Sequence, residues 1–79
     1  MYLFDKRLKQ LRVALNFTQK QLGEATGLSE RGIQNYELGL RKPEYDAIVA
    51  LADYFGVSID YLVGRTDDPA AVRYAEMAL

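Results

Sequence analysis

Four side chains that can read the edges of nucleic-acid bases are clustered between positions 30 and 35. They are Glu30, Arg31, Gln34 and Asn35. The guanidinium of Arg31 can donate two hydrogen bonds to guanine O6 and N7. The side-chain amide of Gln34 or Asn35 matches adenine, and the carboxylate of Glu30 can accept from cytosine N4. An ordinary solvated helix face can carry the same residue types, so the elements that position these side chains decide between the two interpretations.

Capping signals place these four side chains on the second of two short helices, within the stretch Thr18 to Gly39. The first helix is predicted to begin at Thr18, whose hydroxyl can accept from the backbone N–H of Gln21. The Gln21 side chain can return a bond to the Thr18 N–H, which completes a capping box. The second helix is predicted to begin at Ser29, which has the same capping chemistry. The stretch is therefore expected to form a helix, a tight turn and a second helix.

Glycines mark the turn between the two helices and their closest approach. Gly27 lies where the first helix must end in a left-handed residue, a conformation that costs glycine little. Gly23 lies inside that helix, where glycine costs roughly 1 kcal/mol relative to alanine, and close crossing by the second helix would offset this cost. The i, i+3, i+4 spacing predicts an inward face made of Leu22, Ala25, Thr26, Ile33 and Tyr36.

The composition excludes several other kinds of chemistry. The 79 residues include no cysteine and no histidine, which rules out disulfides, thiol catalysis, His-based acid–base chemistry and the usual zinc sites. We expect neither a metal nor a small-molecule cofactor. The net charge of −1 is unevenly distributed, because residues up to Lys42 carry +4 and those from Pro43 onward carry −5. Such a chain can present a basic face to phosphates and an acidic face away from them.

The rest of the chain also has helical patterns, so we expect an all-α fold, a compact bundle of about five short helices. The first helix is predicted over Phe4 to Leu15, with a core stripe of Phe4, Leu8, Leu11 and Leu15. A fourth helix is predicted to begin at Glu44 or Asp46. Its buried stripe would contain Ile48, Leu51, Ala52 and Phe55.

A short fifth helix is predicted between Ser58, as its N-cap, and Gly64. The nearby aromatic side chains are expected in the core rather than in a ligand site; they are Tyr54, Phe55 and Tyr61. A turn at Thr66 is expected to start a tail, in which Pro69 to Met77 could form a sixth helix. A disordered end and a dimerisation element are alternatives of comparable weight for that tail.

The combined pattern resembles the lambda-repressor-like family of helix-turn-helix proteins, also called the Cro or XRE type. The resemblance extends from about Phe4 to Arg65, and its last part is Ile48 to Arg65. It implies a DNA-binding domain over residues 1–65, followed by a tail over residues 66–79 that is helical or dimerising. The positions that carry it are Gln19, Gly23, Gly27, Ile33, Tyr36-Glu37-x-Gly39, the basic pair Arg41-Lys42, and Pro43.

The resemblance also implies roles for residues outside the second helix. In the family, the residue at the position of Arg12 commonly pairs with the glutamate of the Tyr-Glu signature. Arg12 and Glu37 are therefore expected to form a partly buried ion pair with a structural role. Side chains at the helix starts and in the basic loop are candidates for contact with DNA phosphates. These candidates are Gln19, Lys20, Ser29, Arg41 and Lys42.

The favoured function is a sequence-specific DNA-binding transcriptional regulator, a dimeric repressor of a phage, plasmid or bacterial operon. Its partner would be double-stranded DNA, read in the major groove at a near-palindromic operator by a homodimer. We expect a cytoplasmic protein without a membrane segment, because no apolar run is long enough to span a bilayer. The alternative is an antitoxin or other protein-interaction module that also binds DNA. Enzyme activity is not expected, since the sequence contains no catalytic constellation.

Overall fold

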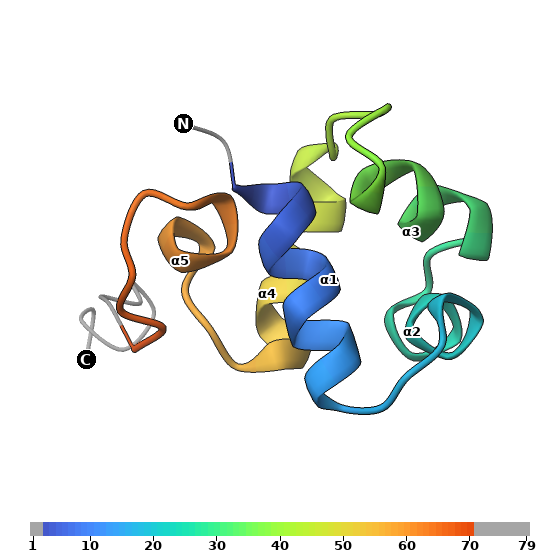
Figure 1. The fold of residues 1–79 in the computed structure, drawn as a ribbon, viewed down its shortest axis with the longest axis horizontal. Helices are drawn as coiled ribbons and strands as arrows, with labels where there is room; N and C mark the ends of the chain where they lie inside the picture. Colours follow the sequence, from blue (N-terminus) through green and yellow to red (C-terminus); the bar gives the residue numbers. More distant parts are fainter. Residues whose placement is uncertain (1–2, 71–79) are drawn as a thin grey trace.

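Five α-helices make up the part of the chain that the computed structural model describes, residues 3–70, and no strand occurs within that range (Figure 1). In chain order they are α1 (Phe4–Ala14), α2 (Gln19–Thr26), α3 (Glu30–Glu37), α4 (Tyr45–Phe55) and α5 (Ile59–Val63). The all-α class and the bundle of about five short helices are confirmed. The sixth helix considered near the end of the chain lies, from residue 71 onward, outside the described residues.

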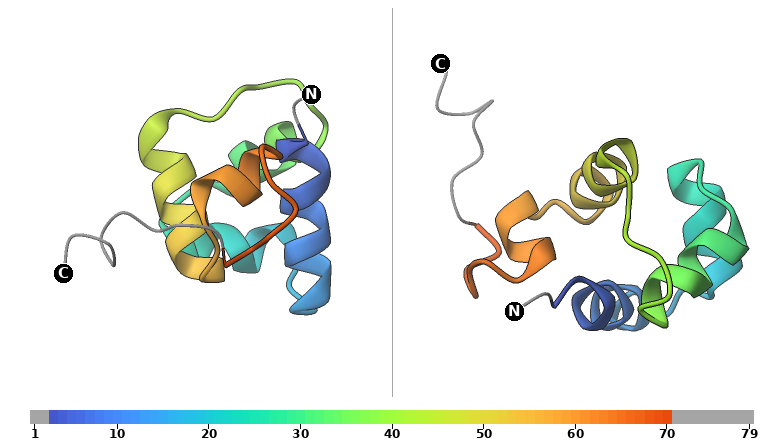
Figure 2. Two further views of the ribbon diagram at one scale, coloured as in Figure 1. Left: turned by 90° about the vertical axis from the view of Figure 1, so that its left-hand side faces the viewer. Right: turned by 90° about the horizontal axis from the view of Figure 1, so that it is seen from above.

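The helices pack as a closed ring around one core. Around the ring, α1 packs against α3, α3 against α2, and α2 against α4. The ring is completed by α5, which packs against both α4 and α1. Figure 1 shows α1 running through the middle of the molecule, with α2 and α3 on one side and α5 on the other. The view from above in Figure 2 shows α4 facing α1 across the bundle. Each helix therefore buries one face against two neighbours.

Every helix contributes one fully buried aliphatic side chain to this core. Burial of such a side chain contributes roughly 1.5–3 kcal/mol relative to leaving it in water. Because the contributions come from all five helices, the core depends on the complete ring rather than on any pair of helices. The five side chains, in chain order, are Leu8, Leu22, Ile33, Leu51 and Leu62.

The predicted capping residues begin the helices in the structure. Thr18 Oγ1 accepts from the Gln21 N–H at 3.0 Å, and Gln21 Oε1 accepts from the Thr18 N–H at 2.8 Å, so the capping box at the start of α2 is confirmed. Ser29 and Ser58 cap α3 and α5 in the same way, each accepting a backbone N–H at 2.9 Å. These starts depend only on residues within one helical turn, which is why the local sequence predicts them.

The first helix is shorter than predicted. It ends at Ala14, and Leu15, which was expected in the core stripe, is 47% exposed, so that expectation is wrong. The cause is Asn16, whose left-handed backbone (φ 58°) turns the chain away before another helical turn can form. The N–H of Phe17 then bonds to the Arg12 carbonyl at 3.2 Å, which leads the chain into α2.

Two other residues expected in the core are exposed. Ala25 faces solvent because α3 crosses α2 at Gly23, so the buried face of α2 is centred on Leu22 and Gly23. Tyr54 is 42% exposed and lies with its ring against Phe17 at the edge of the bundle, with 6.1 Å between ring centroids. Both expectations are wrong, because the sequence pattern does not specify where the neighbouring helix approaches.

A buried arginine that the sequence did not reveal joins the two ends of the described chain. Arg7 is 8% exposed, and its Nη1 donates to the carbonyl oxygens of Tyr61 at 2.7 Å and Thr66 at 2.8 Å. Its Nη2 is paired with the carboxylate of Asp67, and its guanidinium lies 4.1 Å from the centroid of the Tyr61 ring. One side chain on α1 thus binds a carbonyl in α5 and another in the segment that follows α5.

Backbone hydrogen bonds also hold residues 63–69 in place. The Leu3 N–H bonds to the Val63 carbonyl at 3.3 Å, and the Ser58 N–H bonds to the Pro69 carbonyl at 3.2 Å. The sequence placed the start of a tail at Thr66, whereas in the structure the chain stays attached to α1 and α5 as far as Pro69. Within residues 3–70, no helix has the length and apolar character needed to cross a bilayer.

Candidate nucleic-acid interface

The helix pair α2 and α3 is set by two glycines with different roles. A Cβ on Gly23 would lie 2.7 Å from the Leu28 carbonyl oxygen and 3.2 Å from the Glu30 backbone nitrogen, so the start of α3 crosses over α2 where a side chain would clash. Gly27 has φ 77° and no atom within 4 Å of an added Cβ, so it is needed for its backbone conformation alone. Together they place α3 across α2 at a short distance.

The outer face of α3 carries the four predicted base-reading side chains. Glu30, Arg31 and Gln34 are exposed and Asn35 is partly exposed, while Ile33 and Tyr36 are buried on the opposite face. Within the described residues, no hydrogen bond or ion pair engages any of the four side chains. Their donors and acceptors are therefore available to a partner that approaches α3 from solvent.

The candidate phosphate contacts come from α2, from the N-cap of α3 and from the loop after α3, and they differ in whether other groups of the protein bind them. Gln19 and Lys20 lie in the first turn of α2, Ser29 caps α3, and Arg41 and Lys42 lie in the loop that follows α3. Lys20 and Lys42 are exposed and have no partner among residues 3–70. The other three are engaged within the protein: the Ser29 hydroxyl accepts from Gly32, Gln19 bonds to Glu37, and Arg41 is paired with Glu44.

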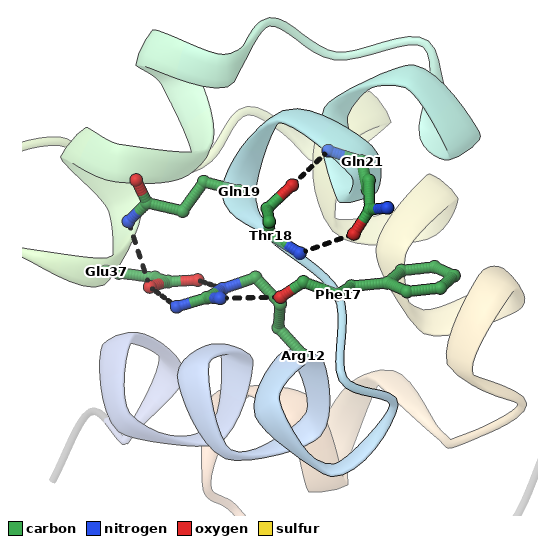
Figure 3. A network of polar contacts seen from close by, with 6 residues as sticks. All are labelled: Arg12, Phe17, Thr18, Gln19, Gln21 and Glu37. Atoms are coloured by element: carbon green, nitrogen blue, oxygen red, sulfur yellow. Dashed lines mark hydrogen bonds and ion pairs between the residues drawn. The ribbon is translucent and has the colours of Figure 1, made fainter.

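A buried ion pair connects α1 to the end of α3. Arg12 Nε lies 2.6 Å from Glu37 Oε2 and Arg12 Nη2 lies 2.9 Å from Glu37 Oε1, and the two side chains are 13% and 4% exposed (Figure 3). Arg12 Nη1 also donates to the Phe17 carbonyl at 2.7 Å. The hydrogen bonds with the Glu37 carboxylate raise the pKa of Arg12 above its ordinary value. The guanidinium therefore stays charged although it is largely removed from water.

Gln19 extends this ion pair to α2. Its Nε2 donates to Glu37 Oε1 at 3.2 Å, and Figure 3 shows Gln19 reaching toward the carboxylate from the side opposite Arg12. Glu37 thus receives hydrogen bonds from two helices while it lies at the end of a third. Because α1, α2 and α3 meet at one carboxylate, the orientation of α3 relative to the rest of the bundle is fixed by a polar contact as well as by the core.

A second polar cluster holds the loop after α3. The carboxylate of Glu44 accepts from the Tyr36 hydroxyl at 2.9 Å through Oε2 and from Arg41 Nε at 3.1 Å through Oε1. The bonds from Arg41, and next those from Tyr36, lower the pKa of Glu44. Burial, and then the bond to Glu44, raises the pKa of Tyr36. The sequence placed Glu44 only at the start of the fourth helix, although its spacing of three residues from Arg41 was a signal for this ion pair.

These features define a lambda-repressor-like helix-turn-helix domain: five helices closed around one core, a glycine-mediated crossing of α2 and α3, and an unobstructed polar face on α3. The chain belongs to the helix-turn-helix family of the Cro/XRE type, whose family model, described as "Helix-turn-helix", matches residues 8–62.

Relatives in the family include bacterial and phage regulators. The uncharacterized HTH-type transcriptional regulator YobD of Bacillus subtilis is 42% identical over 67 residues, covering 85% of this chain and 60% of that protein. The HTH-type transcriptional regulator ImmR of the same organism is 36% identical, covering 78% and 49%. The cryptic phage CTXphi transcriptional repressor RstR of Vibrio cholerae is 38% identical, covering 76% and 54%. The chain thus spans about half to three-fifths of these curated relatives.

Solved structures with the same fold include a repressor bound to DNA. The P22 c2 repressor in complex with a synthetic operator has a TM-score of 0.74 and 28% identity, covering 80% of this chain and 96% of that chain. A transcriptional regulator from Listeria innocua has a TM-score of 0.77 and 26% identity, covering 99% and 73%. The lambda-repressor-like fold expected from the sequence is therefore confirmed.

Proposed function

We propose that this protein is a sequence-specific regulator of transcription that binds operator DNA through α3 and represses the adjoining operon. The observation that carries the proposal is the free polar face of α3, where Glu30, Arg31, Gln34 and Asn35 have no internal partners. A helix with such a face, presented by a compact scaffold, suits the major groove of B-DNA. Relatives named as transcriptional regulators and a fold shared with an operator-bound repressor support the same proposal. The proposed role is binding without catalysis, in the cytoplasm.

The proposed DNA complex contains two copies of the protein. One helix reads only a few base pairs, and a single module rarely binds tightly enough to compete with the non-specific sites of a genome. A symmetric dimer would place its two α3 helices about 34–36 Å apart, in successive major grooves. We place the contact between copies on α5 and the residues that follow it, because this side of the bundle lies opposite α2 and α3 (Figure 1) and Ile59 there is 39% exposed.

Selection of bound sites from random duplex DNA tests the proposal directly. We expect a consensus with two-fold symmetry, and sedimentation should show two protomers on the full site and one on a half-site. Removing residues 71–79 keeps the bond between Ser58 and the Pro69 carbonyl, and an undiminished dimer after this truncation would exclude residues 71–79 from the contact between copies. A full site saturated by one protomer would refute the dimer. Failure to enrich any sequence would refute specific recognition.

Replacing Arg31 by alanine should separate base contacts from phosphate contacts. We expect binding to the selected site to weaken by about 1–3 kcal/mol, with a relaxed preference at one base pair in each half-site. The matched control is Lys20→Ala, which removes an exposed cation outside α3 and should weaken all duplexes alike. Titrations of the selected site, of single-base variants and of random duplex measure both effects. Equal losses for Arg31→Ala on all three would assign Arg31 to phosphate.

A further inference from the structure

Of the two cations in the loop after α3, Arg41 already has an anionic partner within the protein. Arg41 donates through Nε and Nη2 to a single oxygen of Glu44, at 3.1 Å and 2.5 Å. The guanidinium also lies 5.7 Å from the centroid of the Tyr36 ring. The carboxylate occupies the Nε side of the Arg41 guanidinium, which has five N–H donors in all, so a DNA phosphate that approaches this side meets a bound anion.

The carboxylate of Glu44 is not required for the start of the helix that it precedes. Glu44 is the N-cap residue of α4, yet its side chain makes no capping hydrogen bond. Its two oxygens are divided between Arg41, which binds Oε1, and the Tyr36 hydroxyl, which binds Oε2. Since Tyr36 is buried on α3, its hydroxyl keeps the carboxylate beside the loop. The negative charge is thus held close to Arg41.

Exposure decides whether this ion pair can open. The side chains of Arg41 and Glu44 are 51% and 55% exposed, in contrast to the buried pair of Arg12 and Glu37. An exposed pair contributes little, commonly about two- to fivefold in an equilibrium constant. A DNA phosphate, which lies in a dense array of like charges, can therefore displace the carboxylate from the guanidinium.

We propose that Glu44 is an internal competitor of DNA phosphate for Arg41 and so limits the affinity of the protein for the DNA backbone. The inference rests on the proposed function, to which it adds a residue that sets binding strength without reading a base. When Arg41 turns to phosphate, the Glu44 carboxylate loses its cationic partner and stays near the duplex, bound to Tyr36. The pair as a whole carries no net charge, so its contact with DNA releases few counterions.

The variant Glu44→Gln removes the charge and keeps an oxygen that can accept from Tyr36. We expect it to bind both random duplex and the selected operator about two- to fivefold more tightly, because Arg41 no longer has to leave an anion. The slope of log K against log salt should steepen by about 0.9, the value for one additional neutralised phosphate. Fluorescence anisotropy titrations over a range of salt concentrations measure both quantities, and thermal unfolding verifies that the variant is folded.

Two controls separate competition from a general effect of charge. Asp46→Asn removes an equal charge from the first turn of α4, where Asp46 is exposed and has no ion pair with Arg41. It should leave the salt slope nearly unchanged. In an Arg41→Ala background, Glu44→Gln should also have no effect on affinity. If Asp46→Asn matches the gain of Glu44→Gln, or if the gain persists without Arg41, then Glu44 acts by long-range repulsion and the competition is refuted.

Failure of the inference and failure of the proposed function give different results. Wild-type protein that binds its selected operator, together with unchanged affinity and slope for Glu44→Gln, would overturn the role of Glu44 and leave DNA recognition intact. Wild-type protein and variants that bind neither random duplex nor any selected sequence would overturn the proposed function, and the role of Glu44 with it.

Discussion

Replacing Glu37 by alanine is expected to lower the free energy of unfolding by about 3–5 kcal/mol, because it leaves the buried guanidinium of Arg12 without its anion. A domain of this size has a total stability of roughly 4–12 kcal/mol, so the variant should be close to unfolding at room temperature. Gln19 loses its bond to the same carboxylate, so α2 loosens together with α1 and α3. Urea denaturation followed by circular dichroism measures the change.

A double-mutant cycle tests whether the loss comes from the ion pair itself. When Arg12 is also replaced by alanine, the unpaired buried charge disappears, so the double variant should lose less than the sum of the two single variants. Glu24→Ala is a suitable control, since it removes an exposed carboxylate from α2 and should change stability by no more than about 0.5 kcal/mol. Strictly additive losses for Arg12 and Glu37 would show that the two side chains do not stabilise each other.

Replacing Gly23 by leucine is expected to destabilise the protein by about 3 kcal/mol and to weaken operator binding even where the protein remains folded. The first added carbon would lie 2.7 Å from the Leu28 carbonyl oxygen, which belongs to the backbone and cannot rotate away as a side chain could. The helices α2 and α3 must therefore separate, and separation moves the polar face of α3 relative to the rest of the interface. Denaturation and operator titration measure the two effects separately.

The matched control for Gly23 lies two residues further along the same helix. Ala25→Leu introduces the same side chain at an exposed position and should change stability by no more than about 0.5 kcal/mol. Gly27→Ala provides a second comparison, because it places a side chain at φ 77° without any steric neighbour and should cost about 1–2 kcal/mol. If Gly23→Leu is no more harmful than Ala25→Leu, the close crossing of α2 and α3 does not depend on the absence of a side chain.

The ion pair of Arg12 with Glu37 and that of Arg41 with Glu44 illustrate how burial changes the role of the same chemistry. Arg12 and Glu37 are nearly removed from water, so neither can be exchanged without a large loss and the pair serves the fold. Arg41 and Glu44 are half-exposed, so their pair is weak enough to open when a phosphate approaches. The exposed fractions of the side chains therefore assign a structural role to the buried pair and a role in binding strength to the exposed pair.

Local sequence was sufficient to predict the features that depend on one helical turn. The capping residues Thr18, Ser29 and Ser58, and the left-handed residue Gly27, lie where the sequence placed them, because capping and turn conformation involve only near neighbours in the chain. Apolar spacing likewise predicted the all-α class. The pairing of Arg12 with Glu37, which are 25 residues apart, was expected only through the family resemblance.

Tertiary structure alone decided the contacts that join distant segments. Nothing in the local pattern around Arg7 indicates that it is buried or that it bonds to carbonyls as far as 59 residues away. The engagement of Gln19 by Glu37 depends on how closely α2 approaches the end of α3. The exposure of Ala25 depends on where α3 crosses α2, since periodicity defines the faces of a helix but not the position or angle of its neighbour. The sequence therefore determined the helices and the residues offered to DNA, whereas packing determined which of those residues are free to bind it.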